Sequence, residues 1–135
     1  MDKVIFTKLV ALLDRSSAPY SKFNVSAIVL TTKGNVYNGV NVESAAYPTT
    51  ICAEQNAIHT AVTKGMKKGE VHEVHILARN PQGELVQVYP CGSCRQVIAE
   101  QSNANAWVYC YDAKGDTKKH SIDELLPYAF LGAEL

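Results

Sequence analysis

The 135-residue sequence lacks several features that would assign it at once to a class of protein. It has no net charge, with 13 basic and 13 acidic residues, and so lacks the basic stripe that follows a nucleic acid backbone. No apolar run approaches the length of a membrane-spanning helix, and residues 1–6 do not have signal-peptide character. We therefore expect a cytoplasmic protein that binds neither a nucleic acid polymer nor a membrane.

The sequence also lacks internal repeats, low-complexity stretches and linkers, so we expect residues 1–135 to form a single domain. After an initial hairpin, segments of helical periodicity alternate with strand-like segments, which predicts an α/β layer structure. The expected sheet is mixed, has about five strands and is covered by helices. The predicted helices span 3–16, 52–64, 93–101 and 123–126, and the predicted strands span 25–31, 36–42, 71–78, 106–111 and 117–121.

Four cysteines are present, and in a reducing compartment such residues bind metals more often than they form disulfides. Cys110 lies in an apolar strand-like run and is interpreted as a small buried hydrophobe. The other three occur in Cys52-Ala53-Glu54 and Pro90-Cys91-Gly92-Ser93-Cys94. Both motifs stand at predicted helix starts, where free N–H groups and the helix dipole favour a thiolate.

Three thiolates bind zinc well and leave a fourth position open, so we expect one zinc ion held by Cys52, Cys91 and Cys94. The C-x-E and P-C-x-x-C pair is the three-cysteine form of the signature of zinc-dependent nucleobase deaminases. Glu54, two residues from one ligand, can then move protons of the attacking water. Alone it would be interpreted as a first-turn glutamate that complements the helix dipole, but the three cysteines in register favour catalysis.

A structural zinc site with a histidine as fourth ligand is the alternative, in a non-catalytic, zinc-stabilised binding module. The histidines of the chain are His59, His72, His75 and His120. His59 lies two helical turns beyond Cys52, too far to share its ion, whereas His120 stays open. A thioredoxin-like interpretation of C-x-x-C leaves Cys52 and Glu54 unexplained.

Several separated motifs, taken in order, resemble the cytidine deaminase family, specifically its small, three-cysteine, homotetrameric branch. They cover most of the chain and span 18–23, 39–47, 52–54, 90–97 and 124–130. The resemblance implies a three-layer fold with helices on both faces of the sheet. It also implies a homotetramer in which neighbouring subunits complete each site.

The activity that the resemblance implies is a zinc-dependent hydrolase reaction of pyrimidine salvage. Cytidine and 2′-deoxycytidine would be deaminated to uridine and 2′-deoxyuridine, with release of ammonia. An alternative is a deaminase of a modified cytosine nucleoside, or of an aminoacyl-nucleoside antibiotic such as blasticidin S. Asn41 and Glu43 favour a plain nucleoside with a free 3′-hydroxyl.

The resemblance also suggests roles for individual side chains. Phe23 would pack on the base, and the Ala53 backbone would contact it. Asn41 and Glu43 would hydrogen-bond the 3′-hydroxyl of the sugar, and two residues of one strand separated by two project to the same side. Phe130 would reach the site of a neighbouring subunit.

One residue departs from the family pattern. Many three-cysteine members carry arginine directly after the catalytic glutamate, whereas this chain has Gln55. Three thiolates and Zn²⁺ sum to a charge of −1, which makes bound water less acidic. We hypothesise that Gln55 hydrogen-bonds a ligand sulfur without neutralising it, which leaves Arg95 and the helix dipoles to compensate the charge.

Overall fold

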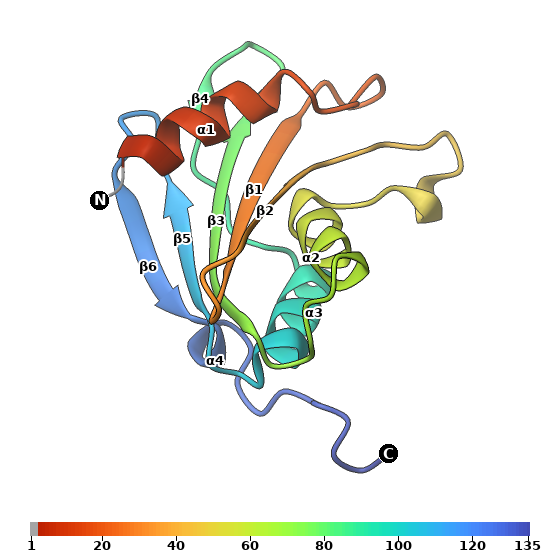
Figure 1. Cartoon of the computed structure of the whole chain (residues 1–135). Coiled ribbons are helices and arrows are strands. Elements are labelled where there is room, and N and C mark those ends of the chain that lie inside the picture. Colours follow the sequence, from red (N-terminus) through yellow and green to blue (C-terminus); the bar gives the residue numbers. More distant parts are fainter. Residues whose placement is uncertain (1–2) are drawn as a thin grey trace.

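A computed structural model describes residues 3–135 and contains one mixed sheet with helices packed against it (Figure 1). The strands are β1 (Asn24–Thr31), β2 (Val36–Val40), β3 (Val71–Arg79), β4 (Leu85–Val86), β5 (Trp107–Tyr111) and β6 (Thr117–Ser121). The helices are α1 (Lys3–Leu13), α2 (Ala53–Thr63), α3 (Gly92–Ser102) and α4 (Ile122–Leu125), with a 3-10 turn, η1, at Tyr47–Thr49. The predicted α/β class is confirmed.

The main strand order is β2-β1-β3-β5-β6, and the short β4 pairs with β3 as a sixth strand. All neighbours are antiparallel except β3 and β5, which are parallel because the connection between them contains α3. Strands β2 and β6 therefore form the two outer edges of this order.

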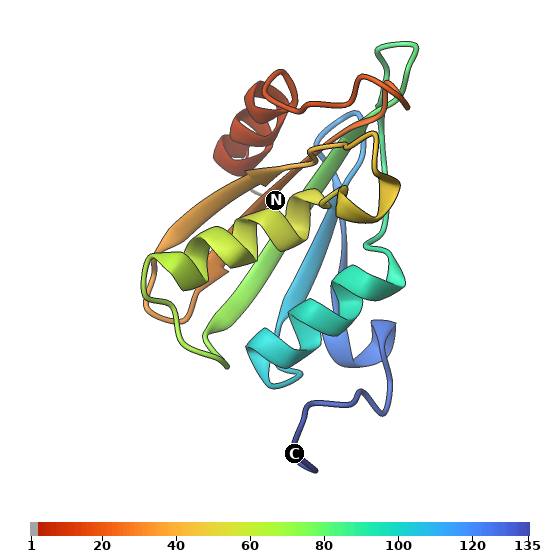
Figure 2. The same cartoon turned by 90° about the vertical axis from the view of Figure 1, so that its right-hand side faces the viewer.

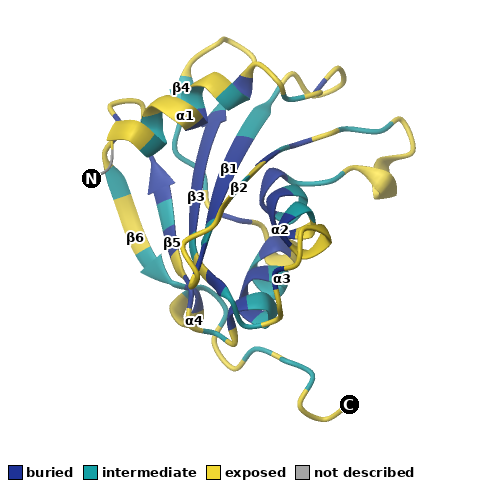
Figure 3. Cartoon of the chain, in the orientation of Figure 1, coloured by how far each residue is buried: buried dark blue, intermediate teal, exposed yellow. Residues whose placement is uncertain are grey.

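Helices cover both faces of the sheet, as expected: α1 lies on one face, while α2 and α3 lie on the other (Figures 1 and 2). Strand β1 serves both layers because successive side chains point to opposite faces. Ala27 and Val29 belong to the core beneath α2 and α3, whereas Ile28 belongs to the core beneath α1. Figure 3 shows the resulting burial of the central strands.

Helix α2 approaches the sheet very closely at Gly39 of β2. A Cβ atom at Gly39 would lie 2.4 Å from the carbonyl oxygen of Ala53 and 2.4 Å from the backbone nitrogen of Ala57. Ala53 and Ala57 are themselves fully buried. Small residues on both partners thus place the N-terminus of α2 against β2.

The main differences from the predicted elements lie at their ends. The first helix ends at Leu13 rather than at residue 16, because the next turn is closed by an i to i+3 bond from Arg15 N to Leu12 O (2.9 Å). Strand β2 ends at Val40, and Val42 instead forms isolated bridges. Strand β4 was not predicted, since two residues are too few to show a period. None of the helices within residues 3–135 has the length and apolar character needed to cross a bilayer.

Candidate active site

The three cysteines of the two motifs meet where the N-termini of α2 and α3 converge. Cys52 is the N-cap of α2, Cys91 is the N-cap of α3, and Cys94 lies in the first turn of α3. Their sulfur atoms all lie within 4.8 Å of one another, and those of Cys91 and Cys94 are 3.5 Å apart. Both motifs therefore stand at helix starts, as the sequence predicts.

This donor set fits a zinc ion. Tetrahedral Zn–S bonds of about 2.3 Å place sulfur atoms about 3.8 Å apart, which matches the spacing of the three thiols. A hydrogen bond with Cys94 lowers the pKa of Cys52 to about 6, and the same hydrogen bond together with burial raises the pKa of Cys94. Cys110 is fully buried, as expected, and burial raises its pKa to about 12.

No histidine joins the three cysteines: within residues 3–135 they are the only group of three or more His, Cys, Asp or Glu side chains so arranged. His75 bonds the hydroxyl of Tyr111 and the carboxylate of Glu73, at 2.8 Å each. His120 packs edge-on against Tyr89, with ring centroids 5.5 Å apart. The arrangement therefore groups three cysteine sulfurs as candidate metal ligands.

Glu54 lies in the first turn of α2, and only 5% of its surface is exposed. Burial raises the pKa of its carboxyl to about 7. A carboxyl that titrates near neutral pH can both accept and return a proton, as a general acid–base catalyst must. The environment of Glu54 therefore suits proton transfer better than simple interaction with the helix dipole.

A cavity of about 300 Å³ joins the cysteine site to three of the predicted substrate contacts. Phe23, Asn41 and Ala53 line it together with Glu54. The same wall includes residues that the sequence analysis did not single out: Val25, Thr50, Ile51, Val88 and Tyr89. Thr50 and Ile51 directly precede Cys52, and Val88 and Tyr89 directly precede the Pro90-Cys91 motif, so their positions could have indicated that they lie near the cysteines. Nothing in the sequence around Val25 indicates a place in the cavity wall.

Glu43 lies in a neighbouring cavity of about 440 Å³, which shares Thr50 with the first. Its carboxylate accepts hydrogen bonds from the backbone nitrogens of Tyr20 and Ser21, at 3.1 Å each, and from the Ser21 hydroxyl. These bonds, with that of the Ser21 hydroxyl first, lower the pKa of Glu43. The structure thus places Glu43 beside the cavity of Glu54 rather than within it.

Asn41 uses its amide to hold the start of β1. Its Oδ1 accepts from Val25 N (2.9 Å) and from the Ser16 hydroxyl (2.5 Å), and its Nδ2 donates to Phe23 O (2.9 Å). Among the bonds of the described residues, this leaves one N–H on Asn41 and one acceptor position on Glu43. A hydroxyl group has the chemistry to pair with either, since it can accept from the amide or donate to the carboxylate.

Gln55 contacts the cysteine site directly. Its Nε2 lies 3.5 Å from the Cys94 sulfur and donates to the Ser93 hydroxyl at 3.0 Å. Arg95 instead donates to two backbone carbonyls, Pro90 O at 2.8 Å and Leu125 O at 3.0 Å. The guanidinium of Arg95 therefore ties the motif to the C-terminal segment, and Gln55 is the side chain at the sulfur.

Phe130 does not line the cavity of Glu54, and 52% of its surface is exposed. Its carbonyl accepts a hydrogen bond of 2.6 Å from Gln96 Nε2 on α3. The backbone is thus fixed to its own chain while the ring stays on the surface. Contact with a neighbouring subunit, which the sequence predicts for this ring, stays a prediction.

Known proteins are similar to this chain in both sequence and fold. The family described as "Cytidine and deoxycytidylate deaminase zinc-binding region" matches residues 1–111. A cytidine deaminase of Sporosarcina psychrophila is 39% identical over 122 residues, which are 90% of this chain and 85% of that protein. One of Halalkalibacterium halodurans is 35% identical over 136 residues, covering 100% of this chain and 98% of that protein.

The crystal structure of a cytidine deaminase from Burkholderia pseudomallei has a TM-score of 0.84 and 33% sequence identity. The match covers 96% of this chain and 100% of that one. A blasticidin-S deaminase of Bacillus cereus is a more distant relative, 30% identical over 115 residues, or 82% of this chain and 79% of that protein. The chain is thus an enzyme that belongs to the cytidine deaminase family.

Proposed function

We propose that the chain hydrolyses cytidine and 2′-deoxycytidine to uridine and 2′-deoxyuridine, with release of ammonia, as a step of pyrimidine salvage. The observation that carries this proposal is the cavity in which Glu54, with a pKa near 7, adjoins Cys52, Cys91 and Phe23. A buried acid–base group, metal-binding thiols and an aromatic wall are the parts that nucleobase deamination needs.

One zinc ion per chain would be held by Cys52, Cys91 and Cys94. When bound, zinc supplies a water acidic enough to act as nucleophile at neutral pH. Thiol ligands must stay reduced to bind it, so the cytoplasm is the compartment that we propose for the enzyme.

Glu54 carries the proton transfers. As a carboxylate it accepts a proton from the attacking water while the oxygen bonds to C4 of cytosine, and it then donates this proton to N3. It next takes the remaining proton of the new hydroxyl and passes it to the amino group. The C4–N bond breaks, ammonia leaves and the carbonyl of the uracil ring forms. One water is consumed for each ammonia released.

The remaining side chains hold the nucleoside. Phe23 packs on the base and the Ala53 backbone contacts it, which fixes C4 near Glu54. The spare N–H of Asn41 and the spare acceptor of Glu43 bind the 3′-hydroxyl of the sugar. This last role requires the sugar to reach from one cavity into the next, past Thr50.

The direct test is turnover of cytidine by the purified protein, followed by loss of the cytidine absorbance band and by ammonia release, with zinc content measured on the same sample. Glu54→Gln should keep the zinc and the fold but lose roughly a thousandfold or more in turnover. Substantial activity of this variant would contradict the role of Glu54. A zinc-loaded wild type that turns over no cytosine nucleoside would instead support a non-catalytic, zinc-stabilised module.

A substrate panel separates the proposal from its closest rival. It contains cytidine, 2′-deoxycytidine, 3′-deoxycytidine, 5-methylcytidine and blasticidin S, the last because of the similarity to a blasticidin-S deaminase. The proposal predicts efficient use of the first two and a large loss for 3′-deoxycytidine, which leaves Asn41 and Glu43 without their hydroxyl partner. Preference for blasticidin S would assign the chain to the rival activity.

A further inference from the structure

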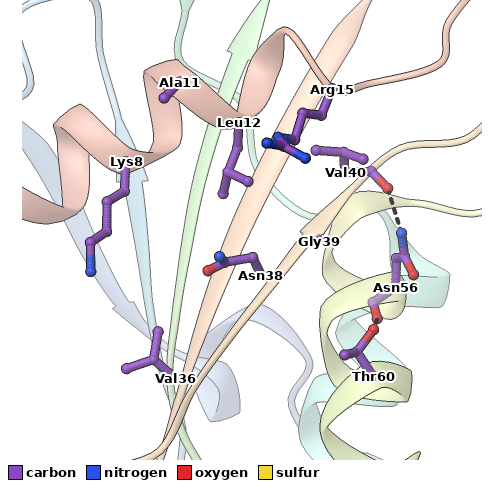
Figure 4. Close-up of a pocket in the computed structure, with 10 residues that line it drawn as sticks. All are labelled: Lys8, Ala11, Leu12, Arg15, Val36, Asn38, Gly39, Val40, Asn56 and Thr60. Atoms are coloured by element: carbon purple, nitrogen blue, oxygen red, sulfur yellow. Dashed lines mark hydrogen bonds between the residues drawn. The ribbon is translucent and has the colours of Figure 1, made fainter.

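A third cavity, of about 770 Å³, lies between α1, the outer edge of β2 and α2 (Figure 4). It shares no lining residue with the cavity of Glu54. Helix α1 contributes Lys8 and Leu12 to its walls, the turn after α1 contributes Arg15, and α2 contributes Asn56 and Thr60. The groove thus follows the free side of an edge strand, bounded by one helix on each face of the sheet.

The backbone of β2 is open toward this groove. Backbone groups of successive residues in a strand point to alternate sides. Those of Val40 point away from β1, as shown by the hydrogen bond of 3.0 Å that its carbonyl accepts from Asn56 Nδ2. Val36 and Asn38 share that direction. Among the described residues β2 pairs only with β1, so the outward N–H and C=O groups of Asn38 have no strand partner.

The two edges of the sheet differ in charge. Strand β6 carries Lys118 and Lys119, and charged side chains on an edge strand oppose pairing with another strand. Strand β2 has the sequence Val-Tyr-Asn-Gly-Val, with no charged residue, and its Val36 is 49% exposed. Edge β2 is therefore the one that can accept a further strand.

The charges near β2 stand on the flanking helix and on the turn that follows it. Lys8 of α1 and Arg15 of the turn after α1 reach toward the strand edge, with Leu12 between them (Figure 4). Within residues 3–135 neither side chain has an ion pair, and no acidic residue lines the groove. The nearby Asp14 is paired with Arg79 at 2.9 Å. The groove therefore offers two cations that lack a counter-charge.

We propose that this groove binds an extended acidic segment of a partner protein, which pairs with β2 as an additional strand. Lys8 lies on α1, and Arg15 lies in the turn directly after it. In a strand, side chains at i and i+4 share a face and lie about 13 Å apart, a span that long cationic side chains can match. The segment that fits has the pattern Glu-x-Val-x-Glu, with the apolar residue on Leu12 and polar residues facing Asn56 and Thr60.

Charge argues against a second copy of this chain as the occupant. If two copies paired through β2, the Lys8 and Arg15 side chains of both would converge on one interface. Neither groove has an acidic lining residue to offset that repulsion. A partner of opposite charge avoids the repulsion and supplies the missing counter-ions.

The test uses a fluorescein-labelled peptide, acetyl-Thr-Glu-Thr-Val-Thr-Glu-Thr-amide, titrated with the full chain and followed by fluorescence anisotropy. We expect binding that weakens with salt and at least tenfold with the double variant Lys8→Glu and Arg15→Glu. The matched control, Lys114→Glu, changes an exposed lysine in the turn between β5 and β6 and should bind like wild type. Hydrogen exchange of residues 36–40 should slow when the peptide binds. Unchanged cytidine turnover by the double variant verifies its fold.

Several results would overturn the proposal. They are no binding by wild type, equal binding by the double variant, or no protection of residues 36–40. A peptide N-methylated at alternate residues cannot extend the sheet, so equal affinity for it would reduce the groove to a site for any anion. Full displacement of the labelled peptide by inorganic phosphate would likewise show that the groove binds any anion. A change of particle mass in the double variant would identify the groove as a contact between copies of the chain.

Discussion

At the scale of single residues, position in a helix and burial set the chemistry of the site. Cys52 and Cys91 cap two helices, where backbone N–H groups and the dipole favour thiolates. Glu54 lies in the first turn of α2, and its burial raises its pKa to about 7. Gln55 brings a neutral N–H donor, rather than a cation, to the Cys94 sulfur. Each of these residues can be changed without altering a large part of the core.

The raised pKa of Glu54 predicts how pH affects the stability of the zinc-free protein. The folded state binds the Glu54 proton more tightly than the unfolded state, whose ordinary pKa is 4.5. The stabilisation is therefore complete below pH 4.5 and is lost as pH rises through 7. Glu54→Gln removes this dependence. Urea unfolding of both chelated proteins at pH 5 and pH 8 should show a relative change on the order of 3 kcal/mol. If the free energies of unfolding of wild type and Glu54→Gln differ by the same amount at both pH values, this prediction is wrong.

Gln55→Arg tests the charge balance of the cysteine site. A guanidinium at the Cys94 sulfur would offset part of the negative charge that three thiolates bring to zinc. The attacking water should then ionise more readily, so the acidic limb of the plot of kcat/KM against pH should move to lower pH. Gln55→Leu, which removes the N–H donor without adding charge, is the control. If Gln55→Arg has the activity and pH profile of wild type, the hypothesis about Gln55 is wrong.

At the scale of helices and strands, the contact between β2 and α2 positions the reacting groups. Gly39 allows the α2 backbone to lie directly on the strand, and the start of that helix carries Cys52 and Glu54. Asn41, just beyond β2, holds the loop of Phe23 through its amide. Strand β2 thus connects the start of α2, which carries Glu54, to Phe23 in the wall of the cavity.

Gly39→Ala is expected to destabilise the fold and to displace the start of α2. Its Cβ would lie 2.4 Å from backbone atoms of α2, so the helix must move as a unit, at a cost of about 1–3 kcal/mol. We expect a lower midpoint of urea unfolding and reduced turnover. Gly92→Ala is the matched control for stability, because a Cβ at Gly92 meets no atom within 4 Å. Equal unfolding midpoints for the two variants would show that the close approach is not needed.

At the scale of the whole molecule, the sheet brings together segments that lie far apart in the sequence. The cavity of Glu54 takes residues from the start of β1, the segment after β2, and the two segments that lead into α2 and α3. The C-terminal segment is tied to α3 by the bond from Gln96 to the Phe130 carbonyl, and the Phe130 ring is exposed. This arrangement fits the proposed homotetramer, in which that ring would complete a neighbouring site.

Phe130→Ala tests that assembly. If the ring completes a neighbouring site, the KM for cytidine should rise about tenfold, while the unfolding midpoint of the protein changes little because the ring is half exposed. Tyr128→Ala, a fully exposed aromatic residue of the same segment, is the control. Particle mass, measured by light scattering, checks for four copies. A monomeric wild-type protein would exclude the tetramer. A Phe130→Ala variant with the wild-type KM would exclude the role of Phe130.

Several features of the fold and the site could be predicted from residues close together in the sequence. The helical periods around Cys52 and after Cys91 predicted two helix starts, and both are observed. The spacing of Cys91 and Cys94 predicted that one helical turn brings their sulfurs together, whereas Cys52 joins them only where the two helix starts converge. Gln55 lies at the Cys94 sulfur through the approach of α2 to α3, and its effect on the charge of the site stays a prediction.

Other features depended on packing between distant segments. Asn41 and Glu43 line adjoining cavities beyond the end of β2 at Val40, and their shared contact with the sugar stays a prediction. Val25 reaches the cavity wall only because β1 lies beside β2. The sequence by itself determined that three thiols and one carboxyl stand at two helix starts, since local helix periodicity and motif spacing suffice for this. Only the tertiary structure decided the shape of the cavity, the burial that tunes Glu54 and the open edge of β2, because each depends on which surfaces exclude water from one another.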